Sequence, residues 1–160
     1  MFTHLHRFIL TAVAITAMSL PSAAQNPGAV QVTSADGTIV SFTISDLDGL
    51  PQVTITTTTL WTEGENTFTG PSLRNVLDAA GLGDNDLTLI ALNDYAIEMP
   101  APATDASYPI VATRMNGAPM SVRDKGPFWI IFPYDSEPDF QTETIYARSI
   151  WQLDRIELAE

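Results

Sequence analysis

The chain has 160 residues, with 19 acidic against 7 basic side chains and a formal net charge of −12, so nucleic acids and anionic membrane surfaces are poor partners. It contains no cysteine, and both of its histidines, His4 and His6, lie close to the N-terminus. The rest of the chain therefore has no thiolate or imidazole to hold zinc, haem iron or an iron–sulfur cluster, and no Ser-His or Cys-His pair for nucleophilic catalysis.

The first 24 residues have the three parts of a secretory signal peptide. Arg7 supplies a positive charge, Phe8 to Leu20 form an apolar stretch, and Ser22-Ala23-Ala24 is a suitable cleavage site. The apolar stretch is shorter than the roughly 20 residues that span a bilayer. We expect cleavage near Ala24, a periplasmic location, and one mature domain, residues 25–160, that is not a membrane protein. The alternative is an uncleaved N-terminal anchor.

Strands are predicted for most of the first half of the mature chain. Residues 25–36 form an entry and a first strand, and Asp36-Gly37 is a tight-turn signal. The next two strands are predicted from β-branched residues, which lose rotamer freedom in helices: Thr38 to Ile44 and Val53 to Trp61. We expect a polar loop at Glu63 to Gly70, of the kind that lines a binding site.

Residues 71–80 have the periodicity of a helix. Pro71 stands where the first helical turn tolerates a missing N–H, and Gly81 is a suitable residue just beyond the last turn. Apolar residues at i, i+3, i+4 and i+7 form one face of this helix: Leu73, Val76, Leu77 and Ala80.

The second half of the chain again predicts strands. A bend at Asn93-Asp94 separates two of them, and Asn116-Gly117 turns another pair. The expected strands are Leu87 to Leu92, Tyr95 to Met99, Ile110 to Arg114, Ala118 to Val122, Phe128 to Phe132 and an alternating strand at Ile150 to Leu158. With one clear helix and short helical turns, the fold class is a β-rich α+β fold with mixed sheets.

Basic side chains of the mature chain gather in its last third. A planar guanidinium forks onto a carboxylate, a phosphate or a carbonyl edge, and it also stacks on a ring face. We therefore expect a polar or anionic ligand near this group: Arg114, Arg123, Lys125, Arg148 and Arg155. The alternative is that each arginine pairs with a nearby acid such as Asp124 or Asp154.

Several aromatic residues are candidates for a stacking surface. Trp129 lies in an apolar strand and is expected in the core, whereas Trp61 stands beside the predicted polar loop. Amphipathic rings at the mouth of a pocket bind flat ligands well. Trp61 is therefore the preferred platform, with Trp151, Tyr134 and Tyr146 as further candidates.

Two acidic features remain. Asp94 lies beside an amide in the Asn93-Asp94 bend, where the pair suits a ligand's donor edge; the alternative is ordinary turn capping. Asp135, Glu137 and Asp139 follow one another in the loop from Pro133 to Thr144, but Pro138 and the missing glycine and glutamate exclude an EF-hand. We expect that loop to be solvated rather than to bind calcium.

Four segments, in order and spacing, resemble the sulfite-oxidase-fold molybdopterin-binding domain: Thr69 to Gly81, Leu92 to Pro100, Arg114 to Pro133 and Ile150 to Ile156. The likeness is greatest to its short secreted bacterial branch, which includes periplasmic pterin-binding proteins that regulate cyclic-di-GMP enzymes of the inner membrane. The resemblance covers nearly all of residues 25–160. It implies that fold and a pterin pocket.

The resemblance does not extend to the metal ligand. The family's enzymes hold molybdenum through a cysteine at the end of a strand that corresponds to Ile55 to Leu60, where this chain has threonines. A hydroxyl is a poor substitute for a thiolate. Redox chemistry and the molybdenum cofactor are therefore not expected.

The resemblance and the side chains together predict a non-catalytic pterin-binding protein. The candidate ligand-binding residues are Trp61, Asp94, Arg114, Arg123, Lys125, Tyr134, Arg148 and Trp151. Occupancy would be reported to the periplasmic sensor domain of a membrane diguanylate cyclase, phosphodiesterase or kinase. Two alternatives remain: a molybdopterin-dependent oxidoreductase subunit that holds the cofactor without a cysteine, and an interaction module without a ligand.

Overall fold

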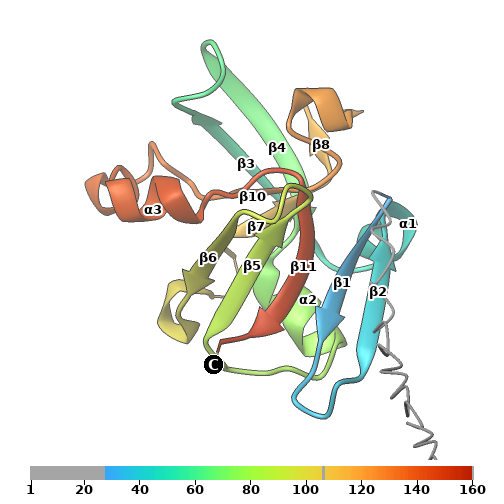
Figure 1. Cartoon of the computed structure of the whole chain (residues 1–160). Coiled ribbons are helices and arrows are strands. Elements are labelled where there is room, and N and C mark those ends of the chain that lie inside the picture. Colours follow the sequence, from blue (N-terminus) through green and yellow to red (C-terminus); the bar gives the residue numbers. More distant parts are fainter. Residues whose placement is uncertain (1–27, 106, 160) are drawn as a thin grey trace, which may run out of the picture.

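The structure is a computed structural model, and it describes residues 28–105 and 107–159. These residues form three sheets and several short helices around one hydrophobic core (Figure 1). The β-rich α+β class predicted from the sequence is confirmed. The expected signal peptide, residues 1–24, lies outside the described residues.

The largest sheet has five strands in the order β2-β1-β11-β5-β6. The strand β1 pairs in parallel with β11, and the other neighbours are antiparallel. Val30 and Val32 of β1 and Leu87, Leu89 and Ala91 of β5 are buried, so one face of the sheet packs on the core. The strands are β1 (Ala29–Thr33), β2 (Ile39–Thr43), β5 (Leu87–Ala91), β6 (Ala96–Met99) and β11 (Leu153–Leu158).

A second sheet has the order β3-β4-β8-β9. Its long hairpin β3–β4 projects from the rest of the molecule (Figure 1). The strands are β3 (Gln52–Thr58), β4 (Glu65–Pro71), β8 (Arg114–Met115) and β9 (Ala118–Pro119). The strands β7 (Ile110–Ala112) and β10 (Trp129–Ile131) pair antiparallel and are fully buried, as the apolar sequence of β10 predicts.

The helices are short. They are α1 (Ile44–Asp48), α2 (Leu73–Ala79) and α3 (Glu143–Arg148), with 3₁₀ turns at Ala101–Ala103, Val122–Asp124 and Pro138–Phe140. Each α-helix begins at a Ser or Thr whose side chain accepts a hydrogen bond from a first-turn N–H. Within the described ranges no helix is both long and apolar enough to cross a membrane.

The predicted helix at 71–80 is present, but its start is different. Pro71 ends the strand β4, and Ser72 is the N-cap, whose hydroxyl accepts a hydrogen bond from Asn75 N at 3.2 Å. The hydroxyl of an N-cap residue accepts a hydrogen bond from a free N–H of the first turn, and the side chain of proline has no oxygen that could do so. Gly81, with φ of 77°, follows the helix as predicted.

Glu63 to Gly70 was predicted to be a loop, and this is wrong. Most of the segment belongs to the strand β4, in which Asn66, Phe68 and Gly70 alternate inward. Buried and more exposed residues alternate along the segment, but because polar residues also stand at buried positions, the sequence does not show this alternation. Gly70 also has a packing role, because a Cβ there would lie 2.0 Å from the carbonyl oxygen of Val111.

The loop predicted at Pro133 to Thr144 contains a 3₁₀ turn and leads into α3, whose six residues have no apolar face long enough to reveal a helix. The alternation predicted across the last strand is interrupted as well. The register between β11 and β5 shifts between Leu153 and Arg155, so Leu153 and Asp154 are both buried.

Candidate ligand-binding pocket

An open pocket of about 420 Å³ lies between three segments that are distant in the sequence. They are the β3–β4 connection, the β5–β6 turn, and α3 with the residues that follow it. Aromatic side chains form most of its walls, and the remaining lining is small, apolar or uncharged: Trp61, Tyr95, Tyr146 and Trp151, with Ala91, Asn93, Ala147, Ser149 and Ile150.

Trp61 is the centre of the aromatic cluster. The hydroxyl of Thr59 accepts hydrogen bonds from the N–H groups of Trp61 and Thr62, at 3.1 and 3.0 Å, and so fixes the turn after β3. The Trp61 ring makes edge contacts with Trp151 and Tyr146, at centroid distances of 5.6 and 5.9 Å. Such tilted geometries are the favoured ones for aromatic pairs.

The helix α3 supplies the wall opposite. Its N-cap Thr142 accepts from Ile145 N at 3.3 Å, and the Nε of Arg148 donates to the carbonyl of Glu98 on β6 at 3.3 Å. The helix is thereby joined to the largest sheet. Tyr146 projects from α3 into the pocket lining.

A buried hydrogen-bond network supports this wall from behind. Tyr134 is 2% exposed, and its hydroxyl donates to Ser149 Oγ at 2.6 Å. Ser149 donates in turn to the carbonyl of Ile145, and its own carbonyl accepts from Trp129 Nε1 at 3.1 Å. Burial raises the pKa of the Tyr134 phenol well above its ordinary value. Tyr134 therefore packs beneath the pocket rather than lining it.

Trp151 is 37% exposed and forms the outer wall. The ammonium of Lys125 lies 5.4 Å from the Trp151 ring centroid and 5.9 Å from that of Trp129. These are cation–π distances. Lys125 is therefore the one predicted cation that the structure brings to the aromatic cluster, although it does not line the pocket itself.

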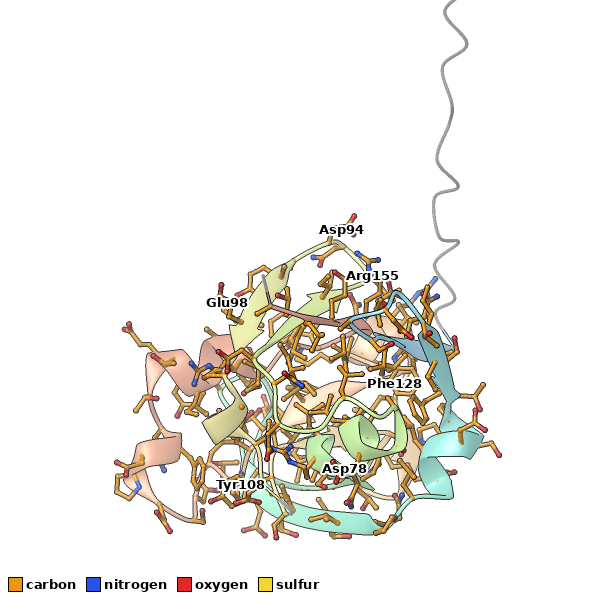
Figure 2. The ribbon with its side chains drawn as sticks, turned by 90° about the horizontal axis from the view of Figure 1, so that it is seen from below. Asp78, Asp94, Glu98, Tyr108, Phe128 and Arg155 are labelled. Carbon is orange, nitrogen blue, oxygen red and sulfur yellow. The ribbon has the colours of Figure 1, made fainter. Side chains whose placement is uncertain are left out.

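The β5–β6 turn contributes Asn93 and Tyr95 rather than Asp94. The side-chain oxygen of Asn93 accepts a hydrogen bond from Tyr95 N at 3.2 Å. The side-chain nitrogen of Asn93 has no hydrogen-bond partner among the described residues. Asp94, with φ of 62°, accepts from Arg155 Nη2 at 2.9 Å, and Figure 2 shows these two side chains together at one end of the molecule. The carboxylate predicted to read a ligand is thus engaged with a protein cation.

None of the five predicted cations lines this pocket, and the four other than Lys125 lie elsewhere. Arg114 forms a bidentate pair with Asp48, at 2.5 and 2.7 Å, and this contact holds the pKa of Asp48 below its ordinary value. Arg148 is bound to the backbone of β6. Arg123 is exposed in the 3₁₀ turn at Val122–Asp124 and has no ion pair or hydrogen bond with the described residues. A local acid partner is present for Arg155, which contacts Asp154, whereas the partner of Arg114 is 66 residues away in the sequence.

Sequence reasoning missed Tyr95 as a lining residue. It is 50% exposed, in a turn where a large aromatic side chain finds no core. A single exposed aromatic residue is common on protein surfaces, so Tyr95 by itself gives no signal of a binding surface. The small residues Ala91 and Ala147 left no signal, because any buried strand or short helix contains such residues.

The lining contains no charged side chain. Across the described residues, no three His, Cys, Asp or Glu side chains are grouped as metal ligands would be. The acidic loop provides one structural contact instead. Asp135 accepts hydrogen bonds from the backbone N–H and hydroxyl of Thr58, at 2.5 and 2.8 Å, and these bonds lower its pKa. The pocket is suited to an uncharged ring face.

No protein-family model and no curated protein sequence matches the chain. Solved structures do resemble it, among them the sulfane dehydrogenase SoxCD from Paracoccus pantotrophus, at 15% identity and a TM-score of 0.63. The match covers 86% of this chain but 39% of the SoxCD chain. A sequence identity this low shows similarity of fold alone. The fold therefore occurs in a protein described as a dehydrogenase. This chain spans about two fifths of the length of the SoxCD chain.

Proposed function

We propose that this chain is a non-catalytic binding protein for a flat heterocycle of the pterin class. One observation carries the proposal. Four aromatic side chains from three separate segments, Trp61, Tyr95, Tyr146 and Trp151, converge on one open pocket without charged residues. A pocket of about 420 Å³ has the volume of small-ligand sites, which are lined mainly by aromatic and apolar groups with a few polar ones.

The polar groups of the pocket favour a ring with a carbonyl group. Asn93 already uses its oxygen in the turn, and its free amide nitrogen is a donor. The hydroxyl of Ser149 is already committed to Ile145. A pterin offers both a π-face for the rings and a carbonyl edge that accepts from Asn93. Asp94 does not take part, because Arg155 occupies it.

The pocket offers molybdenum no protein ligand of the usual kind. The sequence has no cysteine, and the pocket lining has no imidazole, carboxylate or thiolate. Hydroxyl and amide groups are poor ligands for such a soft-ligand metal site. The proposal therefore uses the ring-binding capacity of the pocket and includes no redox step.

Export and signalling belong to the same proposal. The sequence of residues 1–24 supports secretion to the periplasm. Ligand occupancy would be read by the periplasmic sensor domain of a membrane cyclic-di-GMP enzyme or kinase, through contacts that differ between free and bound protein. Ligand-dependent capture of such a domain by the purified chain is the corresponding experiment. Equal capture with and without pterin would exclude a sensing role.

Titration calorimetry and thermal unfolding with oxidised and reduced pterins test the binding proposal. A ligand at 100 times its dissociation constant adds about 2.7 kcal/mol to the free energy of unfolding. We expect stoichiometric binding that Trp151→Ala weakens at least tenfold. Leu60→Ala is the matched control, because Leu60 is 67% exposed next to Trp61 and does not line the pocket. No shift with any pterin would refute the proposal.

Asn93 gives a second, independent readout. Asn93→Asp keeps an oxygen for the turn but replaces the free donor by an acceptor. We expect a pterin with its ring carbonyl to bind more weakly to this variant, and a 2,4-diaminopteridine to bind more strongly. Unchanged preference would remove Asn93 from the site while leaving the aromatic pocket in place.

One second candidate has some support. Because the fold occurs in the sulfane dehydrogenase SoxCD, the chain is alternatively an oxidoreductase subunit that holds a complete molybdenum cofactor through its pterin. This alternative predicts stoichiometric molybdenum in protein purified from the periplasm, which elemental analysis measures. The third candidate, an interaction module without a ligand, predicts capture of a partner that Trp151→Ala leaves unchanged.

A further inference from the structure

The strand β3 forms one edge of its sheet, beyond which no further strand is paired within the described residues. Its inward face carries Val53, Ile55 and Thr57, and its outward face carries Gln52, Thr54, Thr56 and Thr58. On that outward face, threonine hydroxyls pair across the hairpin: Thr54 with Thr69 at 3.4 Å and Thr56 with Thr67 at 3.2 Å. The result is a flat, uncharged threonine surface next to an open edge.

The neighbouring contacts determine which backbone groups face this edge. Thr67 N donates to Asn116 Oδ1 at 2.9 Å, and Thr69 O accepts from Thr113 N at 2.9 Å, so both groups point away from β3. In an antiparallel pair, opposite residues either exchange two hydrogen bonds or exchange none. Thr56 and Thr54, which stand opposite Thr67 and Thr69, therefore direct their N–H and C=O groups to the open side.

Thr58 confirms this direction from the same strand. Thr58 is an even number of residues from Thr54 and Thr56, so its backbone groups point to the same side of the strand. The N–H of Thr58 donates a hydrogen bond to the side chain of Asp135, which lies outside the sheet, at 2.5 Å. Asp135 thus closes one end of the edge. The backbone groups of Thr54 and Thr56 have no partner among the described residues, so an extended chain finds donors and acceptors there.

This edge lacks the devices by which edge strands usually avoid pairing. Such strands carry charges, prolines or bulges, or they are covered by another element. The sequence Gln-Val-Thr-Ile-Thr-Thr-Thr of β3 has no charge and no proline, and its register with β4 continues without a shift. An unprotected edge of this length is unusual for a monomer.

We infer that β3 is a self-association strand, which pairs antiparallel with β3 of a second copy of this chain. A two-fold axis beside Thr54 places the Thr54 residues of the two copies opposite each other. The same axis places Gln52 of one copy opposite Thr56 of the other. The outward backbone groups then form hydrogen bonds in both directions, and the two sheets become continuous. An isologous contact of this kind closes as a dimer.

Charge does not prevent this arrangement, although the chain is strongly acidic. The carboxylates nearest one end of the edge, Glu63, Glu65 and Asp135, gather beside Thr58. At the other end the carboxylate of Asp48 is paired with Arg114. Antiparallel pairing therefore places each Thr58 end beside this ion pair of the second copy. The two acidic ends are then roughly 26 Å apart at about 3.3 Å per residue, beyond the screening length of about 8 Å.

Sedimentation equilibrium of the purified protein over a wide concentration range tests the inference. We expect a dimer whose dissociation constant rises at least tenfold in Thr54→Pro, because proline removes an outward N–H that β4 does not use. Thr54→Lys and Thr54→Glu should each weaken the dimer, since like charges face one another across the axis. A mixture of the two should restore it.

The mixing experiment distinguishes the loss of self-pairing from misfolding of the variants. A variant that merely misfolds cannot regain association when it is mixed with its opposite charge. Ser41→Lys on the edge strand β2 is the control and should leave the dimer unchanged. A protein that stays monomeric at all concentrations would overturn the inference, as would a dimer insensitive to Thr54→Pro or a mixture no stronger than its components.

Discussion

The aromatic pocket joins residues that are far apart in the sequence, whereas the basic segment from Arg114 to Lys125 contains neighbouring residues that point to different places. Trp61 and Trp151 are far apart in the chain, yet their ring centroids are 5.6 Å apart. The cations of the basic segment are close in sequence but diverge, with Arg114 on Asp48 and Lys125 over Trp151. Burial of apolar rings brings the first group together, whereas solvated charges take the nearest counterion.

The positions of aromatic residues are therefore a better guide to this site than the clustering of cations along the chain. Rings must leave water together, and the core decides where they meet. Arginines on short strands and turns gain little by converging, since like charges repel. We therefore expect variants of the aromatic cluster to have larger effects than variants of the cations. The expected order, from the largest effect to the smallest, is Trp61, Tyr134, Lys125 and Arg114.

Trp61→Ala should have the largest effect on both stability and binding. The ring contacts Trp129, Tyr134, Tyr146 and Trp151. Because it is only partly buried, we expect a loss of about 2–3 kcal/mol, below the range for fully buried aromatic residues. Pterin binding should fall below detection. Denaturant unfolding and calorimetry measure the two effects; an unchanged affinity would show that the rings do not form the site.

Tyr134→Phe should cost about 1 kcal/mol, the value of one buried hydrogen bond, and should change pterin affinity less than threefold. Burial raises the phenol's pKa, so the folded state favours the protonated form. The associated stability is present below the ordinary pKa of about 10 and is lost as pH rises above it. The wild type should therefore lose more stability than the variant between neutral and strongly alkaline pH. Parallel curves would contradict this burial.

Lys125→Met tests the one basic residue of the described part of the chain whose charge lies over the aromatic cluster. Removal of the ammonium above Trp129 and Trp151 should cost about 0.5–1 kcal/mol and change the tryptophan fluorescence. The stem of methionine keeps the apolar contact. Arg123→Met, two residues away and exposed, is the matched control and should change neither quantity. Equal effects of the two variants would indicate a general charge effect.

Arg114→Ala should have the smallest effect, about 0.5 kcal/mol or less, because an ion pair that solvent reaches contributes little to stability. Arg114 lowers the pKa of Asp48, so the pair's contribution is present above the ordinary carboxylate pKa of about 4. It is lost as pH falls through the lowered value. The stability difference from wild type should shrink in acid, and Asp48→Ala should behave alike. A loss of pterin affinity in Arg114→Ala would return the ligand to the basic segment.

The sequence by itself determined most of the strands, though not β4, and the class of fold. β-branched runs and alternation predict β3 and β5, and the apolar run predicts that β10 is buried. It also marked three of the pocket's rings, Trp61, Tyr146 and Trp151, as candidates for stacking on a flat ligand. The absence of cysteine bounded the chemistry without any structure.

Tertiary structure alone decided where these elements meet. Period-two alternation hidden by polar residues made Glu65–Pro71 a strand, since Phe68 and Gly70 pack against the core whatever their neighbours are. Asn93 lines the pocket and Asp94 does not, because Arg155 of the distant strand β11 binds the carboxylate. Such contacts depend on which strands become neighbours in a sheet, and a local stretch of sequence does not show its distant partner.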